Sequence, residues 1–387
     1  MSLTTRTTRR DGGAASPSPT ALAGPPVPGV PGVPDGSAAR DAPGRDGRPE
    51  RHRDRHAHRA AILMALCLLV PPLMAASVAV GSRVIDLPTV WNAVAAFDPG
   101  DDAHLVVREL RVPRTILAVL AGGCLGLAGA LMQSLTRNAL AEPGTLGVNA
   151  GAAFGVVIGM SLTGSTAITV SVWFAFAGAG LAAVVVHRLG RAGEAGVNPV
   201  RLVLAGAGLS MTLMALTNIV ILSSPQQVLD QFRNWATGSL QGRGGESLPV
   251  VGTCLLIGLL LAMALSGPLN SVSLGTDMAR ALGVDVRRTW TLTNVAVMVL
   301  AGGATAAIGP VSFVGLAAPH VARALTGPDH RWVLPYSCVI AALAVLAADL
   351  LGRLVLHPGE VGAGVMTAMI GAPFFVALVR RGRVSEL

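Results

Sequence analysis

Few side chains in this sequence are of types that could do chemistry, and their spacing excludes most kinds of active site. The four cysteines, Cys67, Cys124, Cys254 and Cys338, are far apart in the sequence, and each lies in an apolar stretch. No Cys-x-x-Cys spacing occurs, so a zinc or redox site is not expected. We interpret the four cysteines as small apolar side chains of a packed interior.

The basic side chains are all arginine, because the 29 residues counted as Lys or Arg include no Lys. A phosphate-binding P-loop needs the Lys of G-x-x-x-x-G-K-[ST], and a Schiff base needs a lysine amine. The chain also contains neither H-E-x-x-H nor G-x-S-x-G. Ser210 has no histidine at the same depth to activate it. The sequence therefore predicts that this chain is not an enzyme.

The segments that must position any site are long and apolar. The 387 residues are 52% hydrophobic and 13% charged, whereas a soluble domain is about 25% charged. Apolar stretches recur at the roughly 20-residue length with which a helix crosses a bilayer. We predict an all-α polytopic membrane protein with about ten spans, near residues 60–81, 113–134, 146–163, 166–187, 199–223, 248–266, 289–308, 311–326, 332–350 and 362–379.

Residues 1–59 differ from the rest of the chain. They are rich in Pro, Gly, Ala and Ser and end in the Arg/His tract 51–59. A segment of this composition cannot bury a core, so we expect a disordered tail. The tract could hold a metal or anionic lipid, but a solvated tail beside the membrane is the simpler interpretation.

Arginine is unevenly distributed between the two sides of the predicted bundle. An even number of spans places both termini on one side, and that side holds most of the 29 Arg. The other side holds only Arg83, Arg108, Arg111, Arg114, Arg233, Arg243 and Arg353. The positive-inside rule then predicts a multi-pass protein of the cytoplasmic membrane with both termini in the cytoplasm.

Ionisable residues are nearly absent from the predicted spans. Asp349, His320 and Arg323 lie toward span ends. A secondary transporter driven by an ion gradient usually needs a carboxylate near the bilayer midplane. That class of transporter remains an alternative, but the sequence does not favour it.

The loop at residues 266–288 contains a candidate docking element. Thr276 or Asp277 could cap the start of a short helix, and Gly283 suits the left-handed position that ends one. Ordering such a helix costs entropy unless it docks onto something. We expect a soluble partner on the cytoplasmic side.

Several motifs together resemble the FecCD permease family, the membrane subunits of ABC importers for iron–siderophore complexes, haem and cobalamin. The resemblance covers residues 60–383. Its motifs are Arg111-Val112-Pro113-Arg114-Thr115, Gly129–Gln133, Thr136–Gly144, Leu146–Gly151, Leu274–Gly283, Gly309–Leu316, Pro319–Arg323 and Gly371–Phe375. Two departures are Ala139, where the family commonly has Pro, and Val361–Gly364, which replaces Leu-Pro-Val-Gly.

The resemblance implies a ten-helix fold of the type II ABC importer permeases. It implies a dimer with a second permease copy or paralogue, two cytoplasmic ATPase subunits that bind ATP-Mg, and an extracytoplasmic substrate-binding protein. This chain would itself bind no cofactor and no nucleic acid. The implied cargo is a ferric siderophore, with cobalamin or haem as the alternative within the family.

Three sets of residues become candidates for function. The set for coupling to the ATPase is Leu274, Gly275, Asp277, Arg280, Ala281 and Gly283. Arg111, Arg114 and Arg353 resemble family positions that receive the binding protein, with lipid headgroup contact or snorkelling at the helix ends as the alternative. Met211, Met214 and Asn218 recur at helical spacing and are candidates for the translocation path, with core packing as the alternative.

Overall fold

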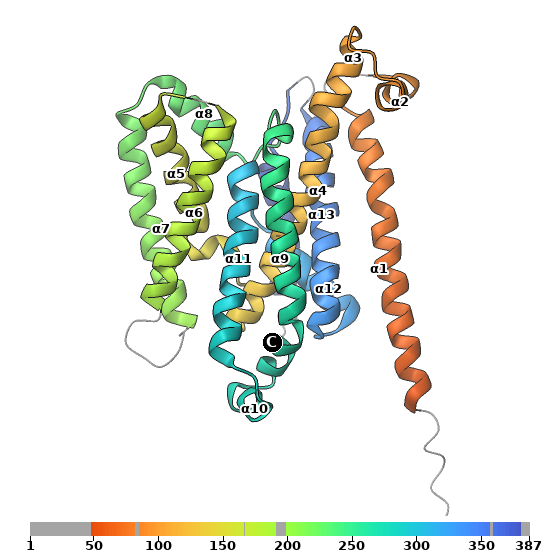
Figure 1. Cartoon of the computed structure of the whole chain (residues 1–387), viewed down its shortest axis with the longest axis vertical. Coiled ribbons are helices and arrows are strands. Elements are labelled where there is room, and N and C mark those ends of the chain that lie inside the picture. The colour runs from red at the N-terminus through yellow and green to blue at the C-terminus, as the bar shows by residue number, and fades with distance from the viewer. Residues whose placement is uncertain (1–47, 82–84, 166, 191–198, 357–358, 381–387) are drawn as a thin grey trace, which may run out of the picture. The chain divides into compact units, whose positions relative to one another are not determined.

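The computed structural model describes residues 48–81, 85–165, 167–190, 199–356 and 359–380 (Figure 1). Nearly all of them belong to one compact unit, His52–Leu387. Most of the predicted tail, residues 1–47, lies outside the described residues. Helix α1 (Arg48–Ala79) begins inside that predicted tail, so residues 48–59 are helical and not disordered. The helix extends because Arg and Ala favour helices and Pro49 is tolerated in a first turn.

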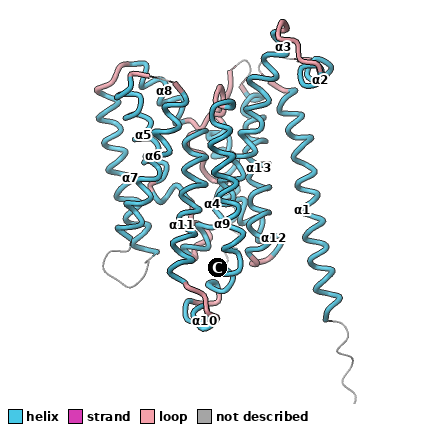
Figure 2. The backbone as a smooth tube through the Cα atoms, viewed as in Figure 1, coloured by secondary structure: helices cyan, strands magenta, loops and turns pink. Residues whose placement is uncertain are grey.

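The described residues form helices and connecting loops and contain no strand (Figure 2). After α1 the chain forms α2 (Leu87–Ala95), α3 (Asp102–Leu105), a π-helical segment (Val106–Arg111), α4 (Val112–Thr136), a 3-10 turn (Pro143–Leu146), α5 (Val148–Thr163), α6 (Ile168–Gly190), α7 (Pro199–Leu222), α8 (Gln226–Ala236), α9 (Gly244–Ser273), α10 (Thr276–Ala281), α11 (Val286–Ile308), α12 (Val314–Thr326), α13 (His330–Val355) and α14 (Ala363–Arg380).

All ten predicted spans coincide with helices, but the helices differ in length. By length and composition, seven helical runs of the described chain could cross a membrane, in α1, α3–α4, α6, α7, α9, α11 and α13. Helices α5 and α14 are shorter apolar helices.

The eighth predicted span, 311–326, is corrected. Helix α12 has 13 residues, or about 20 Å at 1.5 Å per residue, whereas the hydrocarbon core is about 30 Å thick. It begins only at Val314 because the preceding segment is not helical: Gly309 and Phe313 have φ values of 80° and 68°.

Helix α4 lies at the centre of the core and packs against α9, α11, α12 and α13. Small residues allow these backbones to approach closely. A methyl group on Gly126 would overlap the carbonyl of Ser337 in α13, and one on Gly129 would overlap the carbonyl of Gly315 in α12. The glycine spacing that the sequence shows in α4 is therefore a packing feature.

Four of the short helices lie at the two ends of this bundle. Helices α2, α3 and α8 lie at one end, and α10 lies at the other (Figure 1). We call these the α2 end and the α10 end. The sequence analysis predicted α10 but not the helices of the α2 end.

Candidate functional site

Helix α10 is a short helix between two glycine turns. Gly275 precedes it with φ 116°, and Gly283 follows it with φ 78°, so the prediction for Gly283 is confirmed. The predicted side-chain cap is wrong, because Gly275 is the N-cap and no side chain caps the helix. Asp277 lies inside the first turn, where its carboxylate pairs with Arg280 at 3.1 Å.

The exposed face of α10 carries an apolar stripe. Leu274 is the C-cap of α9, Met278 lies in α10, and Leu282 follows α10 directly. They are 68%, 54% and 59% exposed, and we call these three side chains the stripe of α10. Ala279 is fully buried and faces the bundle. Sequence reasoning missed Met278 and Leu282, although the spacing of four could have identified them.

The other predicted coupling residues lie around this stripe. Asp277, Arg280 and Ala281 are exposed, while Gly275 and Gly283 form the turns. An exposed apolar stripe ringed by charged side chains is typical of a surface that binds another protein. The structure therefore places the predicted coupling residues together on one accessible element.

At the α2 end, two arginines and two acids form a charge network. Arg114 donates to Asp349 at 2.8 Å and to Glu360 at 2.7 Å. Arg353 donates to the second oxygen of Asp349 at 2.5 Å. The Asp349 side chain is completely buried, and the Arg353 side chain is 2% exposed. These contacts join α4, α13 and the segment before α14.

Arg111 and Arg353 also hold the last turn of α1. Arg111 Nη1 donates to the carbonyls of Val78 and Ala79 at 3.0 and 2.9 Å. Arg353 Nη1 donates to the carbonyls of Ser77 and Val80 at 2.7 and 2.9 Å. The last carbonyls of a helix lack intrahelical partners and favour cations. The two guanidinium groups therefore cap α1.

These positions argue against the predicted docking role of Arg111, Arg114 and Arg353. A docking arginine must present its guanidinium to a partner, whereas these three are buried or nearly so and bonded to atoms of this chain. The sequence could not show this, because Asp349 and Glu360 are more than 200 positions away from Arg114. Lipid headgroup contact, the alternative interpretation, fails for the same reason.

The candidate path residues lie on an open face of α7. Met211 and Met214 are 76% and 53% exposed, and Asn218 is also exposed. Core packing within this chain is therefore wrong for all three. A polar residue on the open face of a membrane-length helix normally faces protein or water and not lipid.

Two non-helical segments meet in the interior. The Glu142 carboxylate, in the loop after α4, accepts a hydrogen bond from the backbone N–H of Phe313 at 3.0 Å. Burial raises the pKa of Glu142, and the Phe313 N–H partly offsets this. The hydrogen bond thus joins the loop after α4 to the segment before α12.

The Phe313 side chain borders an apolar cavity of about 230 Å³ between α12, α13 and α14. Ile340, Ile370 and Phe374 also line it. Phe313 has a positive φ of 68°, a rare conformation for a bulky residue. The Glu142 hydrogen bond helps to hold this backbone, so the loop after α4 positions the cavity wall.

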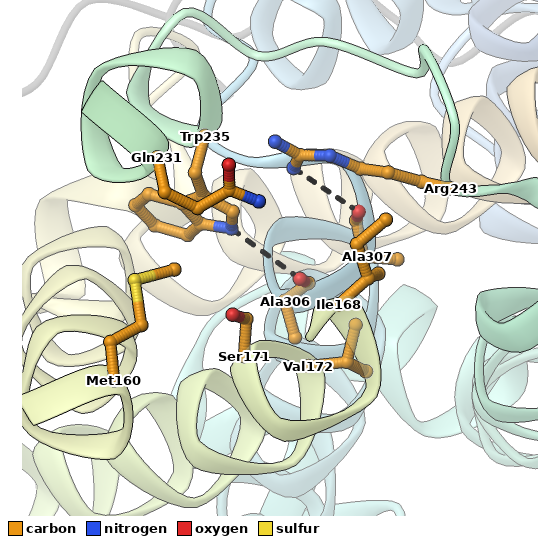
Figure 3. Close-up of a pocket in the computed structure, with 9 residues that line it drawn as sticks. All are labelled: Met160, Ile168, Ser171, Val172, Gln231, Trp235, Arg243, Ala306 and Ala307. Carbon is orange, nitrogen blue, oxygen red and sulfur yellow. Dashed lines mark hydrogen bonds between the residues drawn. The ribbon is translucent and has the colours of Figure 1, made fainter. Parts of the chain in front are cut away.

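A second, much smaller cavity lies near α8 and the end of α11 (Figure 3). Its volume of about 10 Å³ corresponds to about one water. Arg243 donates to the carbonyl of Ala307 at 3.4 Å, and Trp235 Nε1 donates to that of Ala306 at 3.5 Å. Burial lowers the pKa of Arg243 to about 10. This site caps α11 and is too small for cargo.

Among the described residues, no three metal-binding side chains lie close enough to hold an ion. Three of the surfaces described above could contact other molecules: the stripe of α10, the open face of α7 and the apolar cavity beside α14. The sequence model of the FecCD transport family matches residues 66–381. This chain belongs to the FecCD transport family.

FecCD proteins of similar sequence match it over most of their length. The ferric enterobactin transport system permease protein FepD of Escherichia coli (strain K12) is 45% identical over 323 residues, which is 84% of this chain and 96% of FepD. The iron(3+)-hydroxamate import system permease protein FhuB of Bacillus subtilis (strain 168) is 35% identical, over 83% of each chain.

A solved structure confirms the predicted fold. A metal-chelate type ABC transporter in an inward-facing conformation is 27% identical, with a TM-score of 0.71, over 83% of this chain and 99% of that chain. This FecCD protein is thus a multi-pass membrane permease, and the resemblance inferred from its motifs is correct.

Proposed function

We propose that this chain is the permease subunit of an ABC importer that carries a ferric siderophore across the cytoplasmic membrane. Its similarity to FepD along almost the whole of that protein supports this cargo. The energy comes from ATP-Mg bound by a separate ATPase, since this chain has no Lys for a P-loop. The observation that carries the proposal is the solvent-exposed apolar stripe on α10 in a FecCD chain.

In this proposal α10 is the element to which the ATPase binds. Leu274, Met278 and Leu282 enter an apolar groove of the ATPase, and Asp277 and Arg280 contact its polar rim. ATP binding and hydrolysis then move α10 relative to the bundle. The permease imports cargo only because its two states bind the cargo differently.

The exposed faces of α7 and α14 meet a second permease copy or paralogue around the path. Met211, Met214 and Asn218 lie on α7, and Met369 and Val376 are exposed on α14. These mostly apolar, flexible walls interact weakly with many shapes, which suits a bulky chelate.

The α10 end faces the cytoplasm in this proposal. Arg280, Arg287 and Arg288 are exposed there, as the positive-inside rule requires, and both termini lie on that side. The binding protein then docks at the α2 end, where Arg108 and Arg233 are exposed. Charges of this kind steer an acidic partner and set its register.

Deletion of the gene in its native host tests the cargo and the import direction. Iron-starved cells are given ⁵⁵Fe as a catecholate, hydroxamate or citrate chelate, with labelled cobalamin and haem as comparison cargoes. The expected result is loss of uptake of one ferric chelate, restored by the wild-type gene. Unchanged uptake of all three chelates, or uptake that collapses with the ion gradient while ATP remains, would overturn the proposal.

A further inference from the structure

The last turn of α9 is the connection through which α10 joins the bundle. Helix α9 ends at Ser273, and Leu274 and Gly275 lead directly into α10. Gly275 and Gly283, on either side of α10, both have positive φ. Glycines in such turns change conformation at little steric cost. A force on α10 therefore needs a firm side-chain contact near this turn to reach the other helices.

Asn270, one turn before that junction, makes such a contact. Its Oδ1 accepts hydrogen bonds from the backbone N–H of His330 at 2.9 Å and from His330 Nδ1 at 2.7 Å. Its Nδ2 donates to Asp329 Oδ1 at 2.7 Å. Asp329 is also the N-cap of α13 and accepts from the N–H of Arg331. One amide thus joins the end of α9 to the start of α13.

His330 extends this contact to α4. His330 Nε2 lies 2.5 Å from the Ser134 hydroxyl in α4, and this hydroxyl also donates to the carbonyl of Ala130 in its own helix. His330 itself is 8% exposed. We call Ser134, Asn270, Asp329 and His330 the amide tie. Three helices, α4, α9 and α13, meet in it.

A second hydrogen bond reinforces the same turn. Arg137, which ends α4 with φ 49°, donates through Nη2 to the carbonyl of Val272 at 2.7 Å. This leaves the last turn of α9 bonded to α4 and to α13. Along the chain, Leu274 and Gly275 connect this turn to α10.

We propose that Asn270 is a positioning residue that passes the movement of α10 to α13 and α4, and so couples ATP hydrolysis to transport. This inference rests on the proposed function. Without the tie, the ATPase could still grip α10 and complete its cycle, but α10 would move on its glycine turns while the bundle stayed in place.

An amide side chain is suited to this role because it offers an acceptor and a donor together. An aspartate at position 270 would accept from His330 but would lose the donor and oppose the Asp329 carboxylate. Asparagine at position 329 would remove that repulsion and restore the donor, since Asn also caps helices well. The tie can therefore be broken and rebuilt with side chains of nearly equal size.

The test uses the complete transporter, purified from the native host through a tag on this chain and placed in vesicles. For wild type, Asn270→Asp and Asn270→Asp/Asp329→Asn, we measure ATP hydrolysis and import of the ⁵⁵Fe chelate that the deletion experiment identifies. The matched control is Ser271→Ala, whose hydroxyl bonds only to the carbonyl of Gly267 in its own helix.

We expect Asn270→Asp to lower the iron imported per ATP by about tenfold, equivalent to about 1.4 kcal/mol, with ATPase activity within about twofold of wild type. The double variant and the control should import normally. If Asn270→Asp keeps wild-type import per ATP, or if import and ATPase activity fall in parallel, the inference is wrong. If wild-type vesicles import nothing with ATP, the proposed function is wrong instead.

Discussion

The two ends of the bundle are held together by different chemistry. At the α2 end, the charge network buries Arg114, Asp349, Arg353 and Glu360 against one another. At the α10 end, the amide tie joins the helices mainly through neutral hydrogen bonds, with the partly exposed Asp329 as its only acid. Separating buried charges leaves each of them unpaired, which costs far more than separating neutral groups.

This difference indicates which end can move. A network of buried ion pairs has one favourable arrangement, because each charge depends on a fixed partner. Helix α10, by contrast, lies between two glycine turns, which change conformation at little steric cost. We therefore expect the α2 end to keep its helix arrangement while the α10 end changes during the transport cycle.

The largest effect is expected from Asp349→Asn. This change leaves Arg114 and Arg353 facing a neutral amide in a buried site, and removing one partner of a buried ion pair costs about 3–5 kcal/mol. Thermal unfolding of the purified chain in detergent measures the loss. The matched control, Asp277→Asn, breaks an exposed pair in α10 and should cost about 0.5 kcal/mol or less. Equal losses at the two sites would remove the contrast between the two ends.

A smaller loss of stability is expected from Asn270→Leu. The change removes the three hydrogen bonds that Asn270 makes with His330 and Asp329. Because these groups must then bond to water, we expect the free energy of unfolding to fall by about 1–3 kcal/mol. The same thermal unfolding assay compares it with Asp349→Asn. If Asn270→Leu destabilises the chain more than Asp349→Asn, the amide tie is the stiffer of the two contacts, and the assignment of the moving end is reversed.

A pH-dependent effect is expected from Glu142→Gln. Burial raises the pKa of Glu142 above its ordinary value of 4.5, so the folded chain holds this proton more tightly than the unfolded chain does. The stability that Glu142 contributes is complete below pH 4.5 and falls as the pH rises through the raised pKa.

Gln keeps an acceptor for the N–H of Phe313 and cannot ionise. The variant should therefore melt higher than wild type at pH 7.5, and the difference should disappear at pH 4. The exposed Glu109→Gln serves as the control. An advantage of Glu142→Gln that is the same at both pH values would show that ionisation of Glu142 is not its cause.

The smallest effect on stability, combined with a large effect on assembly, is expected from Met278→Asp. Met278 is exposed, and surface changes usually alter stability by about 0.5 kcal/mol or less. The charge would nevertheless interrupt the apolar stripe that we propose the ATPase grips. The ATPase should no longer co-purify with the Met278→Asp variant, while the melting temperature of the variant should equal that of wild type. Retention of the ATPase would exclude the stripe as its binding surface.

Features of the fold that depend on local composition could be predicted from the sequence. Apolar length located a helix at each of the ten predicted spans, and Gly283 located the end of α10, because these signals lie within a few residues of each other. The break before α12 was harder to see. Gly309 and Pro310 mark it, but the apolar residues after them favour a helix that begins at residue 311, three residues before the observed start at Val314.

Contacts between distant segments could not be predicted in the same way. The sequence placed Arg114 at a span end but could not show Asp349 beside it, because only the packing of α4 on α13 joins them. Likewise, Asn270 and His330 are 60 positions apart. The exposure of Met211 was unpredictable for a similar reason, since an isolated helix does not reveal which of its faces the rest of the chain covers.

The backbone contact of Gly126 and Gly129 with α13 and α12 has a consequence for spectroscopy. Helices in contact at their carbonyls cannot slide past one another without lifting apart, so α4, α12 and α13 should turn as a single body. Pairs of spin labels placed within that body should report the same separation throughout the nucleotide cycle. A label on the open face of α7 paired with one on α13 should instead show two populations whose ratio follows ATP.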